Sequence, residues 1–360
     1  MKKKRNLIYL LILIVCTFSI LFIFKNKINK YINNYKLMNK FNYTYKINSN
    51  LDVKGIIDEN NIIIQDGEKL IKYNLKKSKR ENVLVSVENG YNVNSVNTFE
   101  NGIIWVETKD IPNISSKIYI KYYDSDNILL IDETTNKILP QLSVSDNKVV
   151  YYIADEKLFN IKMVNLESGE MNIISSYESN NSNKKYISQP NINSSSIVWS
   201  CMDTEKSIIY IYDIKTNSIN ELSDNELIYN PIFKGNILLG IKQNIYFDEE
   251  INDSYSSNYI VEFDIESKKW TKFKENIISN YVFEPKESIF ALAYNSDLLY
   301  WTSSLRNGNY VYDFTNDIFI PIIKESYNTN TNIIFSKENI IYYEVTIEEN
   351  EKLKFIYNIK

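Results

Sequence analysis

The sequence predicts an all-β protein: a seven-bladed β-propeller, with six blades as the alternative, preceded by one N-terminal transmembrane helix. Three observations support this prediction. Short apolar runs recur along the chain, a second segment ending in Asp or Asn follows each run, and a continuous apolar stretch precedes the first repeat. Repeats of this length, carried by short β-type segments, are typical of blades with four strands each.

Seven apolar runs have the length and composition of buried β-strands. Their first residues lie 40 to 52 positions apart. We expect each run to form the second strand of a blade. The runs begin at Ile62, Ile103, Val149, Ile197, Ile237, Ile289 and Ile340.

Each run is followed by a segment in which an aromatic or aliphatic residue precedes Asp or Asn. We expect these segments to be third strands, because the Asp or Asn side chain accepts hydrogen bonds from the amides of the turn that follows. These residues are therefore predicted to be structural rather than catalytic. They are Asn74, Asp132, Asn165, Asp213, Asp264, Asp313 and Asn358.

The last repeat ends early. Its expected third strand, residues 353–359, is followed only by Lys360, so no fourth strand comes after it. An unpaired sheet edge invites aggregation, and a propeller avoids such an edge by closing its ring. Residues 41–48 have an alternating pattern. We therefore predict that they pair antiparallel with residues 353–359 and complete the seventh blade.

The first 40 residues have the character of a membrane anchor. Lys2, Lys3, Lys4 and Arg5 precede an apolar stretch. As a helix of about 18 residues this stretch would span about 27 Å, close to the roughly 30 Å hydrocarbon core. We expect a single-pass, uncleaved signal anchor with the propeller on the extracytoplasmic side of the cell membrane. The predicted parts are a cytoplasmic tail (1–6), the transmembrane anchor (7–24), a linker (25–40) and the propeller (41–360).

Composition excludes several functional classes. The chain contains no His, so it has no Ser-His or Cys-His nucleophile pair and no imidazole metal ligand. Residues 1–40 hold nine of the 41 basic residues and none of the 45 acidic ones, which leaves the remainder with a net charge of −13. Such a body repels nucleic acid. We expect no cofactor and no metal, and Cys201 has no partner for a disulfide outside the anchor.

Proline residues precede four of the runs, and one third strand leads into a distinctive turn. Pro140, Pro190, Pro231 and Pro285 lie before Val149, Ile197, Ile237 and Ile289. The segment IYIYDIKTNSINELS, residues 209–223, is similar to a Tyr-Asp-Leu-x-Thr-Gly turn before a short outer strand. Residues 51–360 thus resemble the TolB-like, WD40-like β-propeller repeat family. The resemblance implies binding and scaffolding roles, sometimes with a propeller attached to a hydrolase; this chain has no Gly-x-Ser-x-Gly motif for one.

Three insertions between the expected second and third strands are rich in aromatic and acidic residues. They are residues 107–126, 243–258 and 294–308. In an up-and-down meander such connections emerge on one face, where rings stack on sugars or peptides and acids orient them. Solvated loops that cover blade edges have the same composition. The ligand-face candidates are Tyr122, Tyr123, Asp124, Asp126, Tyr246, Asp248, Glu249, Tyr255, Tyr300, Trp301 and Arg306.

Two functions fit these observations. The first is an anchored binding or scaffold module for a protein or carbohydrate partner, favoured because the chain has a tether and a repeat but no recognisable catalytic set. The alternative is a carbohydrate-active enzyme, a glycosidase or a lyase, which would use paired carboxylates. Carboxylate pairs beside Trp or Tyr in a central channel would favour the enzyme, and a channel lined by Ile, Ser and Asn would favour binding. A cation site over residues 124–127 would need further oxygen ligands.

Overall fold

The computed structural model describes the chain over most of the repeats. The described residues are 43–109, 115–135, 139–154, 158–178, 186–202, 206–223, 227–234, 237–248, 253–264, 268–273, 289–295, 298–303, 308–314, 316, 318–322, 330–337, 340–346 and 352–359. The chain divides into two units, and all of the strands belong to the one formed by Tyr43–Pro321 and Tyr327–Lys360. The expected anchor, residues 7–24, lies outside the described residues. Within them, no helix has the length and apolar character needed to cross a membrane.

The strands of the described residues form seven sheets, numbered here in chain order. Sheet 1 contains β2 (Asp52–Asp58), β3 (Asn61–Asp66), β4 (Lys69–Asn74) and β5 (Lys79–Ser86). Sheet 2 contains β6 (Asn92–Phe99), β7 (Gly102–Lys109), β8 (Ser115–Tyr122) and β9 (Ile128–Thr134). Sheet 3 contains β10 (Ser143–Ser145), β11 (Lys148–Ala154), β12 (Leu158–Asn165) and β13 (Met171–Glu178).

The other four sheets continue the same antiparallel order. Sheet 4 contains β14 (Tyr186–Ile187), β15 (Asn191–Ile192), β16 (Ser196–Met202), β17 (Ser207–Asp213) and β18 (Ser218–Ser223). Sheet 5 contains β19 (Leu227–Lys234), β20 (Ile237–Asp248), β21 (Asp253–Asp264) and β22 (Lys269–Lys272). Sheet 6 contains β23 (Ile289–Asn295), β24 (Leu298–Ser303), β25 (Gly308–Asp313) and β26 (Ile318–Pro321). Sheet 7 contains β27 (Asn330–Lys337), β28 (Ile340–Thr346), β29 (Lys352–Asn358) and β1 (Tyr45–Ile47).

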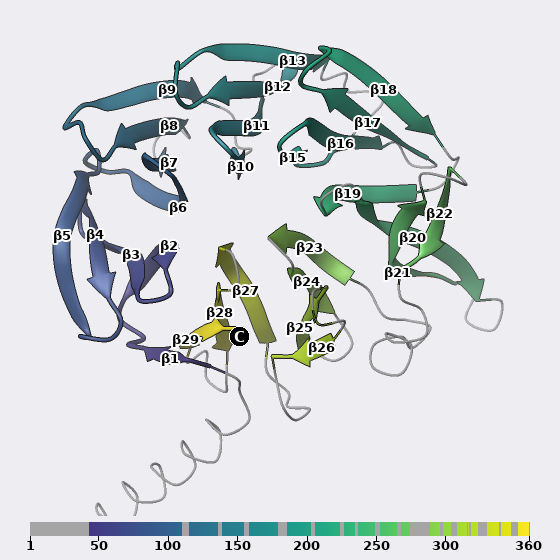
Figure 1. Ribbon diagram of the computed structural model, residues 1–360. Helices are drawn as coiled ribbons and strands as arrows, with labels where there is room; N and C mark the ends of the chain where they lie inside the picture. The colour runs from purple at the N-terminus through teal and green to yellow at the C-terminus, as the bar shows by residue number, and fades with distance from the viewer. Residues whose placement is uncertain are drawn as a thin grey trace, which may run out of the picture. The chain divides into compact units, whose positions relative to one another are not determined.

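Within this unit the sheets follow one another in chain order around a common centre, with the first strand of each sheet innermost (Figure 1). The contacts agree with this order. Strand β2 contacts β6 of the next sheet, β16 contacts β19, and β25 contacts β27. The last sheet returns to the first, because β27 also contacts β2.

Sheet 7 is completed by the N-terminal strand. Strand β1 pairs antiparallel with β29, so that Tyr45 lies opposite Ile356 and Ile47 opposite Lys354. Beside this ladder, the Thr44 amide donates to the Ile356 carbonyl at 2.7 Å, and the Asn358 amide donates to the Thr44 hydroxyl at 2.9 Å. Residues from the two ends of the repeat region thus form one sheet, in the antiparallel arrangement expected for residues 41–48 and 353–359.

The continuous apolar runs are explained by burial on both faces of the second strands. In β3, Ile62 and Ile64 pack between sheets 7 and 1, whereas Ile63 packs between sheets 1 and 2. None of the three has exposed surface. Successive residues of a strand point to opposite faces, so a strand lying between two neighbouring sheets needs apolar residues at every position.

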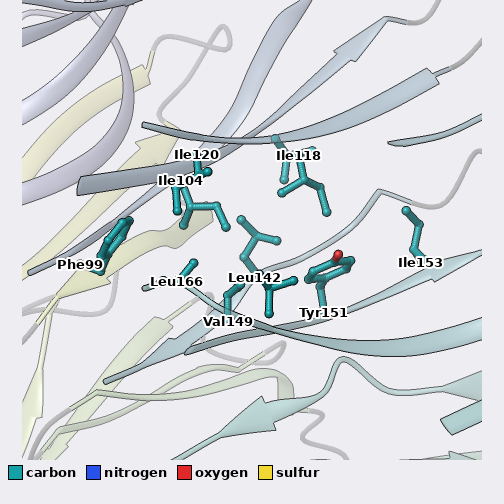
Figure 2. Close-up of a cluster of buried hydrophobic side chains, with 11 residues drawn as sticks. Phe99, Ile104, Ile118, Ile120, Leu142, Val149, Tyr151, Ile153 and Leu166 are labelled. Atoms are coloured by element: carbon teal, nitrogen blue, oxygen red, sulfur yellow. The ribbon is translucent and has the colours of Figure 1, made fainter. Parts of the chain in front are cut away.

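The core is divided into clusters between successive sheets. Figure 2 shows the cluster between sheets 2 and 3, where Ile104, Ile118 and Ile120 face Val149 and Tyr151 of β11. Burial of each large aliphatic side chain contributes about 1.5–3 kcal/mol to the free energy of folding. Similar clusters lie between the other sheets along the chain.

The first strands also approach each other closely. Gly55 in β2 is packed against β6 of the next sheet, and a Cβ atom added at Gly55 would lie 2.4 Å from the carbonyl oxygen of Val96. Any side chain at this position would force the two strands apart. Gly55 therefore permits the contact between sheets 1 and 2.

Two of the seven repeat assignments were wrong. Ile289 begins β23, the first strand of its sheet, and the buried second strand is β24 with Leu298, Leu299 and Tyr300. Asp132 lies in β9, a fourth strand, and the third strand is β8. In both cases a segment that forms a strand was expected to be a loop. Apolar and polar residues alternate in β8, and β24 is short, so neither strand has a long apolar run.

Candidate functional site

The candidates on sheet 2 lie at the turn between its third and fourth strands. Tyr122 ends β8, and Tyr123, Asp124 and Asp126 follow in the turn before β9. The loop expected over residues 107–126 is therefore mostly strand. The Tyr122 hydroxyl donates to the Leu166 carbonyl of sheet 3, and its ring packs edge-on against Phe99 at 6.0 Å. Tyr123, which is 54% exposed, and Asp126 face solvent.

The candidates on sheet 5 lie at the far end of a long hairpin. Tyr246 and Asp248 belong to β20, and Tyr255 belongs to β21. Tyr246 and Tyr255 occupy opposite register positions in the ladder. This hairpin joins a second strand to a third, as expected. The next candidate, Glu249, lies outside the described residues.

The candidates on sheet 6 lie in a strand instead of a loop. Tyr300 and Trp301 belong to β24, and only 2% of the Tyr300 surface is exposed. The loop expected over residues 294–308 is thus wrong over residues 298–303. Arg306 lies outside the described residues.

The candidate set does not gather at one end of the sheets. Successive connections of a meander alternate between its two ends, so the turn after β8 lies at the opposite end of its sheet from a connection between second and third strands. The sheet 5 candidates lie at such a connection. Ligand contact by either group stays a prediction.

A cluster that sequence reasoning missed lies at the other end of sheet 2, where β7 ends and β8 begins. The Glu88–Glu107 cluster consists of Glu88, Tyr91, Trp105, Glu107, Lys117 and Tyr119. Glu107 is at its centre and is only 2% exposed. Trp105 Nε1 donates to Glu107 Oε1 at 2.8 Å, and the Glu88 amide donates to Glu107 Oε2 at 3.2 Å. Burial raises the pKa of Glu107.

The second carboxylate of the cluster has the opposite electrostatic environment. Lys117 Nζ lies 2.6 Å from Glu88 Oε2, and the Tyr119 hydroxyl donates to the same oxygen at 3.3 Å. The hydrogen bond from Lys117 lowers the pKa of Glu88. Lys117 also lies 4.7 Å from the centroid of the Tyr91 ring. The Tyr119 ring stacks on Trp105 at 5.6 Å.

Two carboxyl groups with oppositely shifted pKa values are a pattern found in acid–base catalysis. Here, however, both oxygens of Glu107 already accept hydrogen bonds from the protein, and burial keeps Glu107 from a bound substrate. Glu88 is exposed, and Tyr91, Lys117 and Tyr119 are partly exposed. The cluster is therefore suited to binding a polar ligand at its surface and to fixing the end of β7 beneath it.

Sheet 7 has a similar arrangement, in which a buried aromatic side chain donates a hydrogen bond to a Glu two positions later in the same strand. The Tyr342 hydroxyl donates to Glu344 Oε1 at 2.6 Å, as Trp105 does to Glu107, and Lys352 Nζ lies 3.2 Å from Glu344 Oε2. Burial by itself would raise the pKa of Glu344, because it disfavours the charged carboxylate. The hydrogen bonds from Tyr342 and Lys352 favour the charged form more strongly, so the pKa of Glu344 is lowered. An aromatic residue two positions before Glu in a second strand is the sequence signal that would have identified both Glu residues.

Polar side chains near the centre connect neighbouring sheets. Lys337 Nζ, from β27, donates to the Ile57 carbonyl at 2.8 Å and to the Thr98 hydroxyl at 2.5 Å. Asn191 Oδ1 accepts from the Phe233 amide at 3.0 Å. These bonds cross from sheet 7 to sheets 1 and 2, and from sheet 5 to sheet 4. They are structural contacts between inner strands.

A shallow hollow of about 350 Å³ lies between the first turns of sheets 2 and 3. Residues 98–100 and 144–147 line it, including the carboxylates of Glu100 and Asp146. In the described part of the chain, no three Cys, Asp or Glu side chains are grouped closely enough to hold a metal ion.

Neither a protein-family model nor a curated protein matches the chain. Among solved structures, the β-propeller domain of the Trilobed protease from Pyrococcus furiosus is similar, with a TM-score of 0.54 and 19% identity over 76% of this chain and 84% of that one. A puromycin-hydrolyzing peptidase from Mycobacterium tuberculosis has a TM-score of 0.54 and 10% identity over 83% of this chain and 52% of that one. TolB from Acinetobacter baumannii has a TM-score of 0.45 and 11% identity, over 85% of this chain and 78% of TolB.

The chain thus spans about half the length of the peptidase that it matches. At identities this low, structural likeness shows the fold alone. Together with the sheet order and the packing of each sheet on the next, the likeness to the Pyrococcus furiosus domain shows that this protein has the β-propeller fold.

Proposed function

We propose that the protein is a membrane-anchored propeller that binds a protein or cell-surface ligand outside the membrane. The observation that carries this proposal is the use of the polar side chains at the centre. Lys337, Thr98 and Asn191 hold neighbouring sheets together through hydrogen bonds. A catalytic centre would instead need a carboxylate within hydrogen-bond reach of a bound substrate.

The propeller has seven blades in this proposal. The seven sheets of the described residues support this number, and so does the pairing of β1 with β29. Residues 41–48 then form the closing strand of the last blade.

The anchor and the location rest on the sequence. Residues 7–24 form the membrane span, the basic residues before it stay in the cytoplasm, and the propeller is extracytoplasmic. The net charge of −13 on the remaining chain supports a partner other than nucleic acid.

Membership of the TolB-like, WD40-like repeat family is supported by the turn after β17. The Thr216 amide donates to Asp213 Oδ1 at 2.8 Å, and Asn217 has a positive φ of 54°. The Asp thus closes the turn, and Asn217 adopts the left-handed conformation at the position where the family's turn has Gly.

The anchor is tested on the full-length protein with a C-terminal tag, expressed in a bacterial host. The tag should sediment with membranes, resist extraction at alkaline pH, and be removed when protease is added to the outside of spheroplasts. Release of the protein at alkaline pH, or protection of the tag from external protease, would contradict the anchor or its orientation.

Binding is tested by capture from membranes with the same full-length protein. The control joins residues 1–40 to an unrelated soluble domain. We expect a protein or glycan that is enriched reproducibly over this control. Equal recovery by both proteins would count against the binding function.

The second candidate is the carbohydrate-active enzyme, in which Glu88, the exposed carboxylate of the Glu88–Glu107 cluster, would contact the substrate. The protein is incubated with a panel of polysaccharides, and both new reducing ends and unsaturated products are measured. We expect no turnover. Turnover that is lost in Glu88→Gln would establish the enzyme in place of the binding module.

A further inference from the structure

We propose that the outer strand of sheet 2, β9, binds an extended partner segment whose apolar centre is flanked by Lys or Arg residues. This proposal rests on the proposed binding function and identifies a surface for it. The partner segment would lie along β9 as an additional strand. Three independent features of β9 lead to this inference.

The first feature is an exposed run of aliphatic side chains. Ile128, Leu129 and Leu130 are 40%, 47% and 50% exposed. Since neighbouring residues of a strand point to opposite faces, both faces of β9 present apolar surface. A partner segment would remove this surface from water, which is the main favourable contribution to association.

The second feature is the composition of β9 compared with that of the outer strand of sheet 1, β5. Strand β5 has Lys79, Arg80 and Glu81 at its start, as expected for an outer strand that avoids pairing with other chains. The first four residues of β9 are all aliphatic and carry no charge. Strand β9 therefore lacks, in this part, the charged protection that β5 has.

Sheet 3 also has an exposed aliphatic side chain on its outer strand. Ile173 of β13 is 61% exposed and occupies the register position opposite Lys162. Lys162 Nζ in turn lies 2.7 Å from Asp132 Oδ2 of β9. Ile173 is therefore a separate exposed residue beside this ion pair.

The third feature is the free edge of β9. Strand β9 is the last strand of its sheet and pairs with β8 alone among the strands that the structure describes. Its regular register covers Ile128, Leu129 and Leu130 and is interrupted by a bulge before Asp132. An added strand would therefore pair over a short stretch and end at the bulge. Strand addition of this kind obtains affinity from main-chain hydrogen bonds and specificity from side chains.

The charges beside β9 identify the kind of partner. Asp124 and Asp126 precede the strand and are exposed, although Lys121 Nζ lies 3.9 Å from one oxygen of Asp126. Glu133 follows the apolar residues and is also exposed. An apolar segment with basic residues at both ends would match this pattern.

The same charges disfavour a second copy of this chain as the occupant. In an antiparallel pair of two β9 strands, Asp126 of one copy would approach Glu133 of the other at both ends of the ladder. Like charges opposite each other destabilise strand pairs. The acidic ends therefore favour a different, basic partner over self-association.

The test uses the full-length protein in lipid nanodiscs and a labelled ten-residue probe peptide, in which six alternating Val and Ile residues lie between Lys-Arg pairs. Fluorescence anisotropy should show saturable binding. Leu129→Lys should weaken this binding by about tenfold or more. The matched control is Ile219→Lys on the outer strand β18, where the residue is 44% exposed, and it should leave binding unchanged. Replacing the terminal Lys-Arg pairs of the probe by Glu-Asp should also weaken binding about tenfold.

The proposal would be overturned by absence of saturable binding, by equal loss in Leu129→Lys and Ile219→Lys, or by a dimer of the native protein that Leu129→Lys dissociates. The last result would identify a second copy as the occupant. Circular dichroism of both variants checks that they fold. If membrane capture still recovers a partner with Leu129→Lys, this inference fails while the binding function stands.

Discussion

At the scale of single residues, the neighbouring carboxylates of Glu107 and Glu88 show how position in the fold changes the pKa of a side chain. Glu107 and Glu88 lie 19 positions apart in the chain, yet the amide of one donates to the carboxylate of the other. The sequence indicates only that acidic residues occur here. Their opposite pKa shifts arise from the fold, because Glu107 is buried beneath Trp105 whereas Glu88 meets Lys117 at the surface.

Glu107→Gln should change how stability depends on pH. Burial raises the pKa of Glu107 above its ordinary value of 4.5, so the folded state holds this proton more tightly than the unfolded state. The native protein should gain stability relative to the variant as the pH falls from neutrality toward 4.5, and should lose this gain as the pH rises through the raised value. Urea unfolding of both proteins over this pH range measures the difference.

Glu133→Gln is the control for this experiment, because Glu133 is exposed at the outer edge of the same sheet. The change of the stability difference with pH should be larger for Glu107→Gln than for this control. A change for Glu107→Gln no larger than that of the control would contradict the expected effect of burial.

Asn165→Ala should destabilise the turn after β12. Asn165 Oδ1 accepts hydrogen bonds from the amides of Glu167 at 2.9 Å and Ser168 at 3.3 Å. Each such bond contributes about 0.5–1.5 kcal/mol, so the free energy of unfolding should fall by about 1–2 kcal/mol. Asn165→Asp keeps the acceptor oxygen and should retain most of this stability. Equal losses in the two variants, measured in urea, would show that the acceptor is not the cause.

At the scale of strands, partners decide the role of a segment more than its composition does. Ile289 and its neighbours have the apolar character of a second strand, yet they form β23, the first strand of sheet 6. The short run Leu298–Leu299 has both of its residues buried in β24. Apolar runs predict burial correctly, but the order of strands within a sheet depends on which neighbours cover each face.

Deletion of residues 41–48 should markedly lower the unfolding temperature. It would leave β29 with an open edge and remove β1 together with Ile47, which is only 4% exposed in the native protein and packs in the core between sheets 7 and 1. Calorimetry on the full-length protein measures this change. Replacement of residues 41–48 by a Gly-Ser segment of equal length should have a similar effect. An unchanged transition in both variants would rule out a stabilising role for β1.

At the scale of the whole molecule, long-range hydrogen bonds join sheets that are distant in sequence. Lys337 is separated from Ile57 by 280 positions and from Thr98 by 239. Lys337→Met should lower the free energy of unfolding by about 1–3 kcal/mol, because it leaves partly buried acceptors without this donor. Lys352→Met should cost less than about 1 kcal/mol, since Lys352 forms an exposed ion pair with Glu344. Similar losses of unfolding free energy in both variants would contradict the expectation that the partly buried hydrogen bonds of Lys337 contribute more than the exposed ion pair of Lys352.

The repeat by itself determined the all-β class, most of the second strands and the turn role of residues such as Asn74, Asn165 and Asp213, whose side chains accept turn amides. These features depend on local alternation and on hydrogen bonds to near neighbours, which are encoded within a few residues. Tertiary structure alone decided that Tyr300 is buried, that Tyr122 and Tyr246 lie in strands leading into different kinds of connection, and that Glu88 meets Glu107. Those outcomes depend on which strands pair and which sheets pack, and these interactions join residues far apart in the chain.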